Sequence, residues 1–474
     1  MAAWQPIATL AADVQAGRQS ALALVNQSLQ TIEEQSDYSA IIVTLAERAL
    51  ARAAYLDERI AAGETVGSLA GVPFIAKDNF LVFGSETTAA STMLRGFVAP
   101  YQATAIDRLE AAGAICVAKA NLDAFAHGSS TENSDFMTTK NPHDQSRVPG
   151  GSSGGSAAAV MLDMAPFALG TDTGGSIRLP ASYCGAVGYK PTYGLVSRSG
   201  VVAMASSTDV IGPLTKTVAD AALVLDVLAG RDERDGTTID KNPDGYAQLQ
   251  PSLKGQKVGV IKEYMAEGVA PAVRQQITAA INAMNTAGAE VVEVSLPSLP
   301  AALAVYYILC PAEVSSNLSR YDGQRFGFSA PDTGNLDDSF KRSRSQGFGP
   351  EAKRRIMIGT YVLSSGYYDA YYKKAQIVRT KLINEFTKAL KTIDFLIGPT
   401  APDVAFKIGE NVTDPLKMYL TDILTVAANL VGVPSISIPV GRADGLPVGL
   451  QIMAAQKADS QLLSFAAGVE EVIG

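Results

Sequence analysis

Two short stretches rich in glycine and serine constrain this chain more than any other feature. The first, residues 148–156, reads Val-Pro-Gly-Gly-Ser-Ser-Gly-Gly-Ser, and the second, residues 171–176, reads Thr-Asp-Thr-Gly-Gly-Ser. Each precedes a run that can form a helix, whose N-terminus offers unpaired N–H groups and a partial positive charge. Glycine lets such a backbone approach a ligand closely. The stretches therefore predict turns that carry serine hydroxyls beside a site able to stabilise an anion.

Three kinds of functional site use turns of this type. A phosphate-binding loop is disfavoured, because no Gly-Lys-Ser/Thr follows the glycines. A hydrolase nucleophile elbow fits the motif Gly-x-Ser-x-Gly at 150–154, but that arrangement needs a histidine after the serine. The two histidines, His127 and His143, both precede it, and we expect His127 to be packed or hydrogen-bonded rather than catalytic. This leaves serine catalysis with a lysine base, against the plainer alternative of a structural loop.

Lys77 is the candidate base. It follows an apolar run, residues 69–76, that we expect to form a buried strand. A serine hydroxyl is a poor nucleophile until a base takes its proton, and a lysine must be neutral to do so. Burial lowers the pKa of a lysine from about 10.4 toward that condition. A single lysine at a strand end would otherwise be interpreted as a surface residue, but the two serine-rich turns favour the catalytic role.

The second turn supplies the candidate nucleophile, Ser176. Four backbone N–H groups there can converge on one oxygen as an oxyanion hole, those of Thr173, Gly174, Gly175 and Ser176. Ser152 would then stand between Lys77 and the nucleophile and relay the proton. The reverse order of the two serines is also compatible with the sequence.

Composition limits the classes of function. The net charge is −8 with no run rich in lysine and arginine, so we expect any RNA to be held by a partner. The three cysteines are far apart, which predicts no metal site and a reducing compartment, the cytoplasm. We expect no signal peptide and no membrane span, because the least charged long run, 423–440, is interrupted by polar and proline residues and is typical of a core segment.

Hydrophobic periodicity predicts one α/β domain over residues 1–474. Within it we expect a helical collar at 1–63, a core with the catalytic motifs at 66–230, a surface linker at 231–252, and the remaining sheet and substrate-pocket helices at 253–474. Besides the strand before Lys77, strands are expected at 114–118, 166–169, 257–261, 290–294, 394–397, 435–439 and 448–452. Helices between them imply βαβ connections and parallel pairing.

Three motifs together resemble those of the amidase signature family. They are Gly-Val-Pro-x-x-x-Lys-Asp-Asn at 71–79, Gly-Gly-Ser-Ser-Gly-Gly-Ser at 150–156 and Gly-x-Asp-Thr-Gly-Gly-Ser-Ile-Arg at 170–178. The resemblance spans nearly the whole chain and implies a central twisted mixed β-sheet covered by helices on both faces. It also implies a Ser-cis-Ser-Lys triad, in which Ser176 is the nucleophile, Ser152 the bridging serine after a cis peptide bond, and Lys77 the base.

Four further stretches are similar to the A-type subunits of the glutamyl-tRNA(Gln)/aspartyl-tRNA(Asn) amidotransferases within that family: 128–134, 316–323, 354–374 and 445–452. The similarity implies a glutamine pocket made by Ser129, Thr131, Tyr306, Arg355 and Asp422. Arg355 and Asp422 would bind the carboxylate and the ammonium of glutamine, because a guanidinium pairs with a carboxylate and a carboxylate accepts from an ammonium.

The activity implied by this resemblance is hydrolysis of glutamine to supply ammonia for converting Glu-tRNA(Gln), Asp-tRNA(Asn) or both to the amidated forms. The implied partners are a kinase and tRNA-binding subunit, which uses ATP and Mg²⁺, and a small linker subunit. This chain is expected to hold no cofactor or metal. Two alternatives remain: a stand-alone amidase acting on a small carboxamide, and a non-catalytic scaffold subunit, which the presence of Lys77, Ser152 and Ser176 disfavours.

Overall fold

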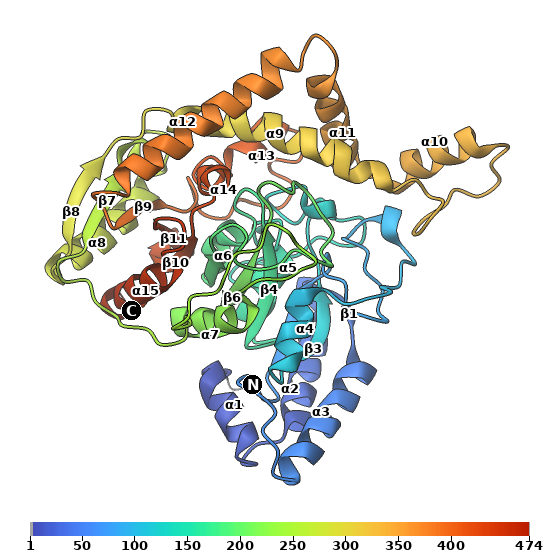
Figure 1. Cartoon of the computed structure of the whole chain (residues 1–474), viewed down its shortest axis with the longest axis horizontal. Helices are drawn as coiled ribbons and strands as arrows, with labels where there is room; N and C mark the ends of the chain where they lie inside the picture. The colour runs from blue at the N-terminus through green and yellow to red at the C-terminus, as the bar shows by residue number, and fades with distance from the viewer. Residues whose placement is uncertain (1–2, 474) are drawn as a thin grey trace.

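One mixed sheet of eleven strands runs through the computed structural model, which describes residues 3–473 (Figure 1). The strand order is β1-β3-β2-β4-β6-β5-β10-β11-β9-β7-β8. The strands are β1 (Ile41–Thr44), β2 (Pro73–Lys77), β3 (Ile115–Ala120), β4 (Phe167–Asp172), β5 (Val187–Lys190), β6 (Val210–Thr215), β7 (Lys257–Ile261), β8 (Glu290–Val294), β9 (Phe395–Pro399), β10 (Ser435–Ala443) and β11 (Leu446–Met453). β2 pairs in parallel with β3 and β4, and β7 with β8 and β9, while the other neighbours are antiparallel. The predicted mixed sheet is confirmed.

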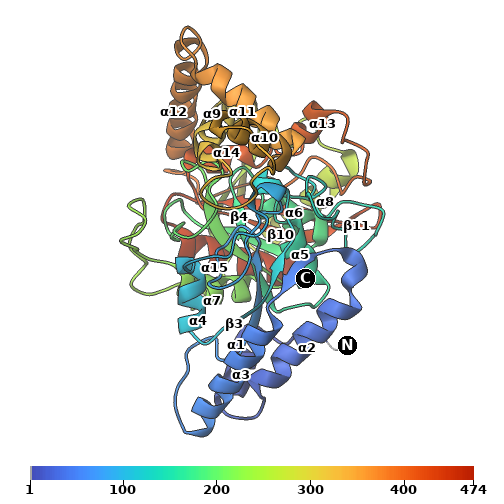
Figure 2. The same ribbon diagram turned by 90° about the vertical axis from the view of Figure 1, so that its right-hand side faces the viewer.

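Helices cover both faces of this sheet. Every residue of β2, β3, β4, β6, β9 and β11 is buried, and successive side chains of a strand point to opposite faces. Figure 2 shows α5 (Gly154–Met161) and α6 (Arg178–Cys184) on one side, and α7 (Val218–Leu228) and α15 (Asp459–Ile473) on the other. This two-sided burial explains the apolar composition of these strands.

The N-terminal segment departs from its predicted form. Helices α1 (Ile7–Gln15), α2 (Ala21–Glu34) and α3 (Ala46–Ala61) follow the expected periodicity. The expectation that residues 1–63 are helical throughout is wrong at Ile41–Thr44, which forms β1 and pairs with β3. Four β-branched residues between two helices are too short a run to show a period, and pairing with β3 decides their conformation.

The remaining helices and strands agree only in part with the sequence predictions. α4 (Thr104–Ala111) and α8 (Pro271–Thr286) occupy runs predicted to be helical, whereas β5 and β6 were not predicted from the sequence. Within the described chain, residues 231–252 contain no helix or strand. The remaining helices are α9 (Ala302–Asn317), α10 (Leu336–Gly347), α11 (Pro350–Leu363), α12 (Lys374–Ala389), α13 (Pro415–Leu420) and α14 (Val426–Val431).

α9, α11 and α12 form a layer at the end of the molecule opposite α1–α3 (Figure 1). Among residues 3–473, one helical segment, Leu299–Arg320, is long and apolar enough to cross a membrane by length and composition, and half of its most apolar window is buried. Its α9 portion packs against α11, α12 and α14, so we interpret it as a core helix. The run 423–440 is α14 and the start of β10, which agrees with its prediction as a core segment.

Candidate active site

The carboxyl end of β2 places Lys77 inside the sheet, where it is completely buried. Its Nζ lies 2.8 Å from Ser152 Oγ, 2.9 Å from Ser153 Oγ and 2.9 Å from Thr171 Oγ1. Thr171 belongs to β4, which runs parallel to β2, so both strands deliver their ends to the same edge. The Gly/Ser loop reaches this edge from the start of α5.

These three contacts suit a neutral amine, which has two N–H donors and one lone pair. Ser153 Oγ already donates to the Thr171 carbonyl at 3.2 Å, and Thr171 Oγ1 accepts from Asn79 Nδ2 at 3.1 Å. Both oxygens can therefore accept from Lys77, and the lysine lone pair can face the hydroxyl of Ser152. Burial lowers the pKa of Lys77 to about 7, against the opposing influence of nearby aspartates, chiefly Asp123. A substantial neutral fraction is thus present at physiological pH.

Close packing fixes the conformation of the loop that carries Ser152. The peptide bond between Gly151 and Ser152 is cis. A Cβ on Gly151 would overlap the carboxylate of Asp123, so only glycine fits there. The buried Thr131 hydroxyl donates to the Gly150 carbonyl at 2.8 Å and accepts from Gly154 N at 3.1 Å, which ties both ends of the loop together. Thr131 thus positions the loop, and its predicted contact with substrate stays a prediction.

A buried ion pair holds the second turn. Arg178 Nε and Nη2 donate to the two oxygens of Asp172 at 3.0 and 2.9 Å, and both side chains are fully buried. Asn429 Nδ2 donates to the same carboxylate at 2.9 Å. Burial by itself would raise the pKa of Asp172, but the charge and hydrogen bonds of Arg178 lower it to about 2. The turn therefore carries a permanent carboxylate that orders the backbone N–H groups around it.

One of the four predicted oxyanion donors is used by this carboxylate. Gly175 N donates to Asp172 Oδ1 at 2.8 Å, so the expectation that its N–H is free for a substrate oxygen is wrong. Thr173 N, Gly174 N and Ser176 N make no hydrogen bond within residues 3–473 and remain able to donate. Thr173 anchors the turn through its hydroxyl, which donates to Asp209 Oδ1 at 2.7 Å.

Ser176 is the most accessible member of the predicted triad, at 8% exposed. Its carbonyl accepts from Ser153 N at 3.1 Å, which joins the two serine-bearing turns directly. Its hydroxyl makes no hydrogen bond in the described part of the chain. The first link of the predicted relay, Lys77 to Ser152, is therefore formed, whereas the second link, Ser152 to Ser176, is not made as a hydrogen bond in this conformation.

A cavity of about 210 Å³ lies beside these turns. Asp123, whose carboxylate packs against Gly151, contributes to its wall, as do Ser129 and Arg355. Segments far apart in the sequence line it, from the loop after β3, from α11 and from α13.

Arg355 and Asp422 flank this part of the molecule without pairing with each other. Arg355 Nε donates to Glu351 Oε1 at 2.9 Å, and its guanidinium lies over the rings of Tyr307 and Tyr419. Asp422 accepts from Ser129 Oγ and from Tyr307 at 2.9 Å each. Burial raises the pKa of Asp422 to about 7. Tyr307 thus contacts both groups, the guanidinium of Arg355 through its ring face and the carboxyl group of Asp422 through its hydroxyl.

Tyr306 and Asp422 also approach the oxyanion turn. A Cβ on Gly174 would lie 2.6 Å from the Tyr306 ring, so the ring packs directly on that backbone. Thr425 Oγ1, three residues beyond Asp422, lies 2.6 Å from the Gly174 carbonyl and 3.1 Å from the Asp422 carbonyl. The predicted substrate residues Ser129, Tyr306, Arg355 and Asp422 are therefore brought together next to the turn of Ser176.

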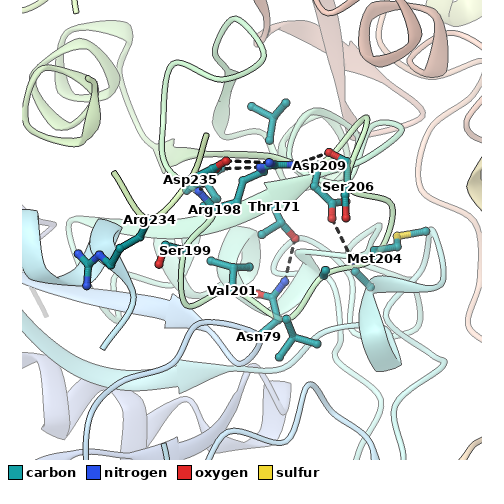
Figure 3. A pocket seen from close by; sticks show the side chains of 15 residues that line it. Asn79, Thr171, Arg198, Ser199, Val201, Met204, Ser206, Asp209, Arg234 and Asp235 are labelled. Carbon is teal, nitrogen blue, oxygen red and sulfur yellow. Dashed lines mark hydrogen bonds and ion pairs between the residues drawn. The ribbon is translucent and has the colours of Figure 1, made fainter. Parts of the chain in front are cut away.

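A second cavity, also of about 210 Å³, is lined by Asn79 and by Thr171, whose hydroxyl contacts Lys77 (Figure 3). Figure 3 shows Asn79 bonded to Thr171 below a wall that includes Arg198 paired with Asp235 and, farther round, Asp209. This second cavity shares no lining residue with the first cavity, which Arg355 lines.

Sequence reasoning missed several residues of the site. Ser153 and Thr171 accept hydrogen bonds from Lys77. Glu351 accepts from Arg355, and Tyr307 donates to Asp422. A sequence signal existed for Glu351, because an acidic residue four positions before an arginine on a helix predicts an ion pair. His127 is packed as expected, but neither of its ring nitrogens has a hydrogen-bond partner in the described chain.

Comparisons with known proteins agree with this geometry. A family model described as amidase matches residues 23–463. The A-type subunit of glutamyl-tRNA(Gln) amidotransferase from Thermoanaerobacter pseudethanolicus is 52% identical over 455 residues, which cover 95% of this chain and 93% of the relative. The crystal structure of the same type of subunit from Thermotoga maritima is similar with a TM-score of 0.80 and 41% identity, covering 95% of this chain and 91% of that one. A peptide amidase from Stenotrophomonas maltophilia is similar with a TM-score of 0.82 and 31% identity, covering 99% and 97%.

Proposed function

The chain belongs to the amidase family, and we propose that it is the glutamine-hydrolysing subunit of a tRNA-dependent amidotransferase. The observation that carries the proposal is the contact of 2.8 Å between the buried amine of Lys77 and Ser152 Oγ, beside the turn of Ser176. The relatives that are about half identical over most of the chain are named as amidotransferase subunits. Their names favour this function over a stand-alone amidase.

In the proposed reaction, Ser176 Oγ attacks the side-chain carboxamide carbon of glutamine. Its proton passes to Ser152 as the proton of Ser152 passes to neutral Lys77. The link between the two serines forms when substrate is seated, since catalytic hydrogen bonds often tighten only in the complex. The N–H groups of Thr173, Gly174 and Ser176 are the donors available to stabilise the developing oxyanion.

The C–N bond then breaks, and the leaving nitrogen takes a proton from Lys77 through Ser152 and departs as ammonia. A glutamyl ester on Ser176 remains until a water molecule, deprotonated by the same relay, releases glutamate. Arg355 binds the α-carboxylate of glutamine, and Asp422, held by Ser129 and Tyr307, accepts from its α-ammonium. Tyr306 shapes the pocket where it packs on Gly174.

The rest of the proposal concerns the assembly. The ammonia passes to partner subunits in the cytoplasm, one of which uses ATP and Mg²⁺ to activate tRNA-bound glutamate or aspartate. A small linker subunit completes a heterotrimer. The net charge of −8 supports binding of tRNA by a partner rather than by this chain.

The test is ammonia release from glutamine by the assembled enzyme. Ser176→Ala should lower kcat by about 10³-fold or more, because the nucleophile is removed, and should abolish the glutamyl ester detected on the wild-type chain by mass spectrometry. Ser36→Ala, in the short turn after α2 and outside the cavity lining, is the control and should match wild type. Unchanged ammonia release by Ser176→Ala would favour a scaffold role. Rapid turnover of simple amides without partners would favour a stand-alone amidase.

A further inference from the structure

The imidazole of His127 has a fixed position but no polar contact within the fold. Its carbonyl accepts from Asn133 Nδ2 at 2.7 Å, and its N–H donates to the Ala124 carbonyl at 3.0 Å, so the backbone is anchored on both sides. The side chain is fully buried, and both ring nitrogens lack a partner among residues 3–473. Buried polar groups in proteins are nearly always hydrogen-bonded, and an unsatisfied one destabilises the fold. The two ring nitrogens of His127 therefore make no hydrogen bond that stabilises the described fold.

His127 is among the residues that line the cavity beside Arg355 and Ser129. Burial lowers the pKa of His127 well below its usual value, and the positive charge of Arg355 lowers it further. The imidazole is thus neutral at physiological pH, with one N–H donor and one acceptor nitrogen.

Arg355 by itself does not fill all the hydrogen-bond acceptor positions of a bound carboxylate, so a second donor can bind there. Arg355 Nε is committed to Glu351, and its Nη1 lies 4.0 Å from Cys310 Sγ. A carboxylate has about four acceptor positions on its two oxygens, more than the remaining edge of one guanidinium fills. A neutral N–H in the same wall can supply a further bond, and its second nitrogen can accept from an ammonium or a water molecule.

We propose that His127 is a specificity-determining residue that hydrogen-bonds the amino-acid end of glutamine beside Arg355. This inference rests on the proposed function, because it concerns the α-carboxylate and α-ammonium groups of that substrate. His127 takes no part in proton transfer at Ser176. It discriminates glutamine from carboxamides that lack the charged groups.

The experiment compares two substitutions in the assembled enzyme. His127→Met keeps a side chain of similar size without hydrogen-bonding nitrogen, and should lower kcat/KM for glutamine by on the order of 10-fold or more, mainly through KM. His127→Gln restores a donor and an acceptor and should recover kcat/KM to within about threefold of wild type. Arg355→Met, the comparator, should change KM in the same direction.

Two readouts separate this role from a structural one. Turnover of butyramide, which has the carboxamide but neither charged group, should be the same for His127→Met and wild type. The Tm of His127→Met should equal or exceed that of wild type, because an unsatisfied buried polar group is replaced by an apolar one. Tyr264→Phe is the matched control: it removes another buried unpartnered polar atom, outside the cavity, and should leave glutamine kinetics unchanged.

The outcomes separate the two proposals. If the wild-type assembly releases no ammonia from glutamine, the proposed function fails and this inference fails with it. If wild type is active and His127→Met is within about twofold of it, only the inference is overturned. Equal losses on glutamine and butyramide, or a lowered Tm without rescue by His127→Gln, also overturn it, because they show a packing role.

Discussion

Lys77 and Lys190 show how the partners of a residue, rather than its burial, decide what it does. Both lysines are fully buried, and burial lowers the pKa of each to about 7. Lys190 Nζ donates to the carbonyls of Val433 and Pro191 at 2.6 and 3.1 Å. Carbonyl oxygens have no proton to give, so Lys190 is a structural residue. Lys77 instead faces three hydroxyl groups, one of which can yield its proton.

The first residue-scale prediction is that Lys77→Arg lowers ammonia release from glutamine by about 10²- to 10⁴-fold, the usual contribution of a general base. Arginine stays charged at any working pH and cannot accept a proton. The measurement is kcat in the assembled enzyme after circular dichroism has shown a folded chain. Lys190→Arg is the matched control, and its kcat should stay within a few-fold of wild type. Near-normal kcat for Lys77→Arg would rule out the lysine base.

The second residue-scale prediction concerns pH. Because Lys77 acts when neutral and its pKa is lowered to about 7, kcat/KM for glutamine should rise with pH through about 7 and level off above it. Asp422, with its pKa raised to about 7, also becomes charged over this range and strengthens ammonium binding as pH rises. Asp172, with its pKa lowered to about 2, stays ionised throughout.

Asp422→Asn separates these two contributions to the pH profile. The variant should bind glutamine more weakly yet keep a rise in kcat near pH 7, because Lys77 still titrates. The prediction is contradicted if kcat/KM of the wild type stays flat or falls between about one pH unit below the pKa of Lys77 and about two pH units above it.

At the scale of elements, the pocket depends on how closely α9 and α11 approach. α9 carries Tyr306 and Tyr307, and α11 carries Arg355. A Cβ on Gly359 of α11 would overlap the carbonyl of Pro311 inside α9, so glycine lets the two backbones touch. The helices therefore bring the aromatic wall and the guanidinium together through a contact one turn away from Arg355.

We predict that Gly359→Ala pushes these helices apart. Overpacking a close contact typically costs about 1–3 kcal/mol, so Tm should fall by several degrees, and KM for glutamine should rise because Arg355 moves relative to Tyr307. Differential scanning calorimetry and steady-state kinetics measure the two effects. Gly268→Ala, at a glycine with open space around its Cβ position, is the control. Unchanged Tm and KM in Gly359→Ala would show that the helix contact does not set the pocket.

At the scale of the whole molecule, the end of α11 and the connection to α12, which includes a π-helical turn (Asp369–Lys373), present exposed tyrosines at the end opposite α1–α3 (Figure 1). Tyr361, Tyr367 and Tyr371 are 46%, 42% and 40% exposed, and their rings contact one another, with centroids 4.3–6.2 Å apart. Aromatic residues are enriched in protein interfaces. If the proposed function holds, this chain is a subunit, and we predict that the tyrosine cluster contacts a partner protein.

The corresponding prediction is that Tyr367→Glu weakens assembly with the partner subunits by about 10-fold or more, because a charge is placed within the cluster. The Tm of the isolated chain should not change, since the side chain is largely exposed. Affinity by isothermal titration calorimetry measures the effect. Tyr55→Glu, on α3 and 54% exposed, is the matched control and should assemble normally. Equal affinities for wild type and Tyr367→Glu would place the interface elsewhere.

The sequence by itself determined the parts of this protein whose signal is local. Glycine-serine turns of fixed spacing identify Lys77, Ser152 and Ser176, and the apolar runs at 257–261 and 290–294 predict β7 and β8 at their observed bounds, because backbone conformation and burial there follow from neighbouring residues.

Only the tertiary structure decided the rest. It pairs β1 with β3, joins Ser129 to Asp422, packs Tyr306 on Gly174, and leaves His127 without a polar partner among residues 3–473. Such contacts join residues far apart in the sequence, 293 positions for Ser129 and Asp422, and no short-range pattern in a chain encodes which of them will meet.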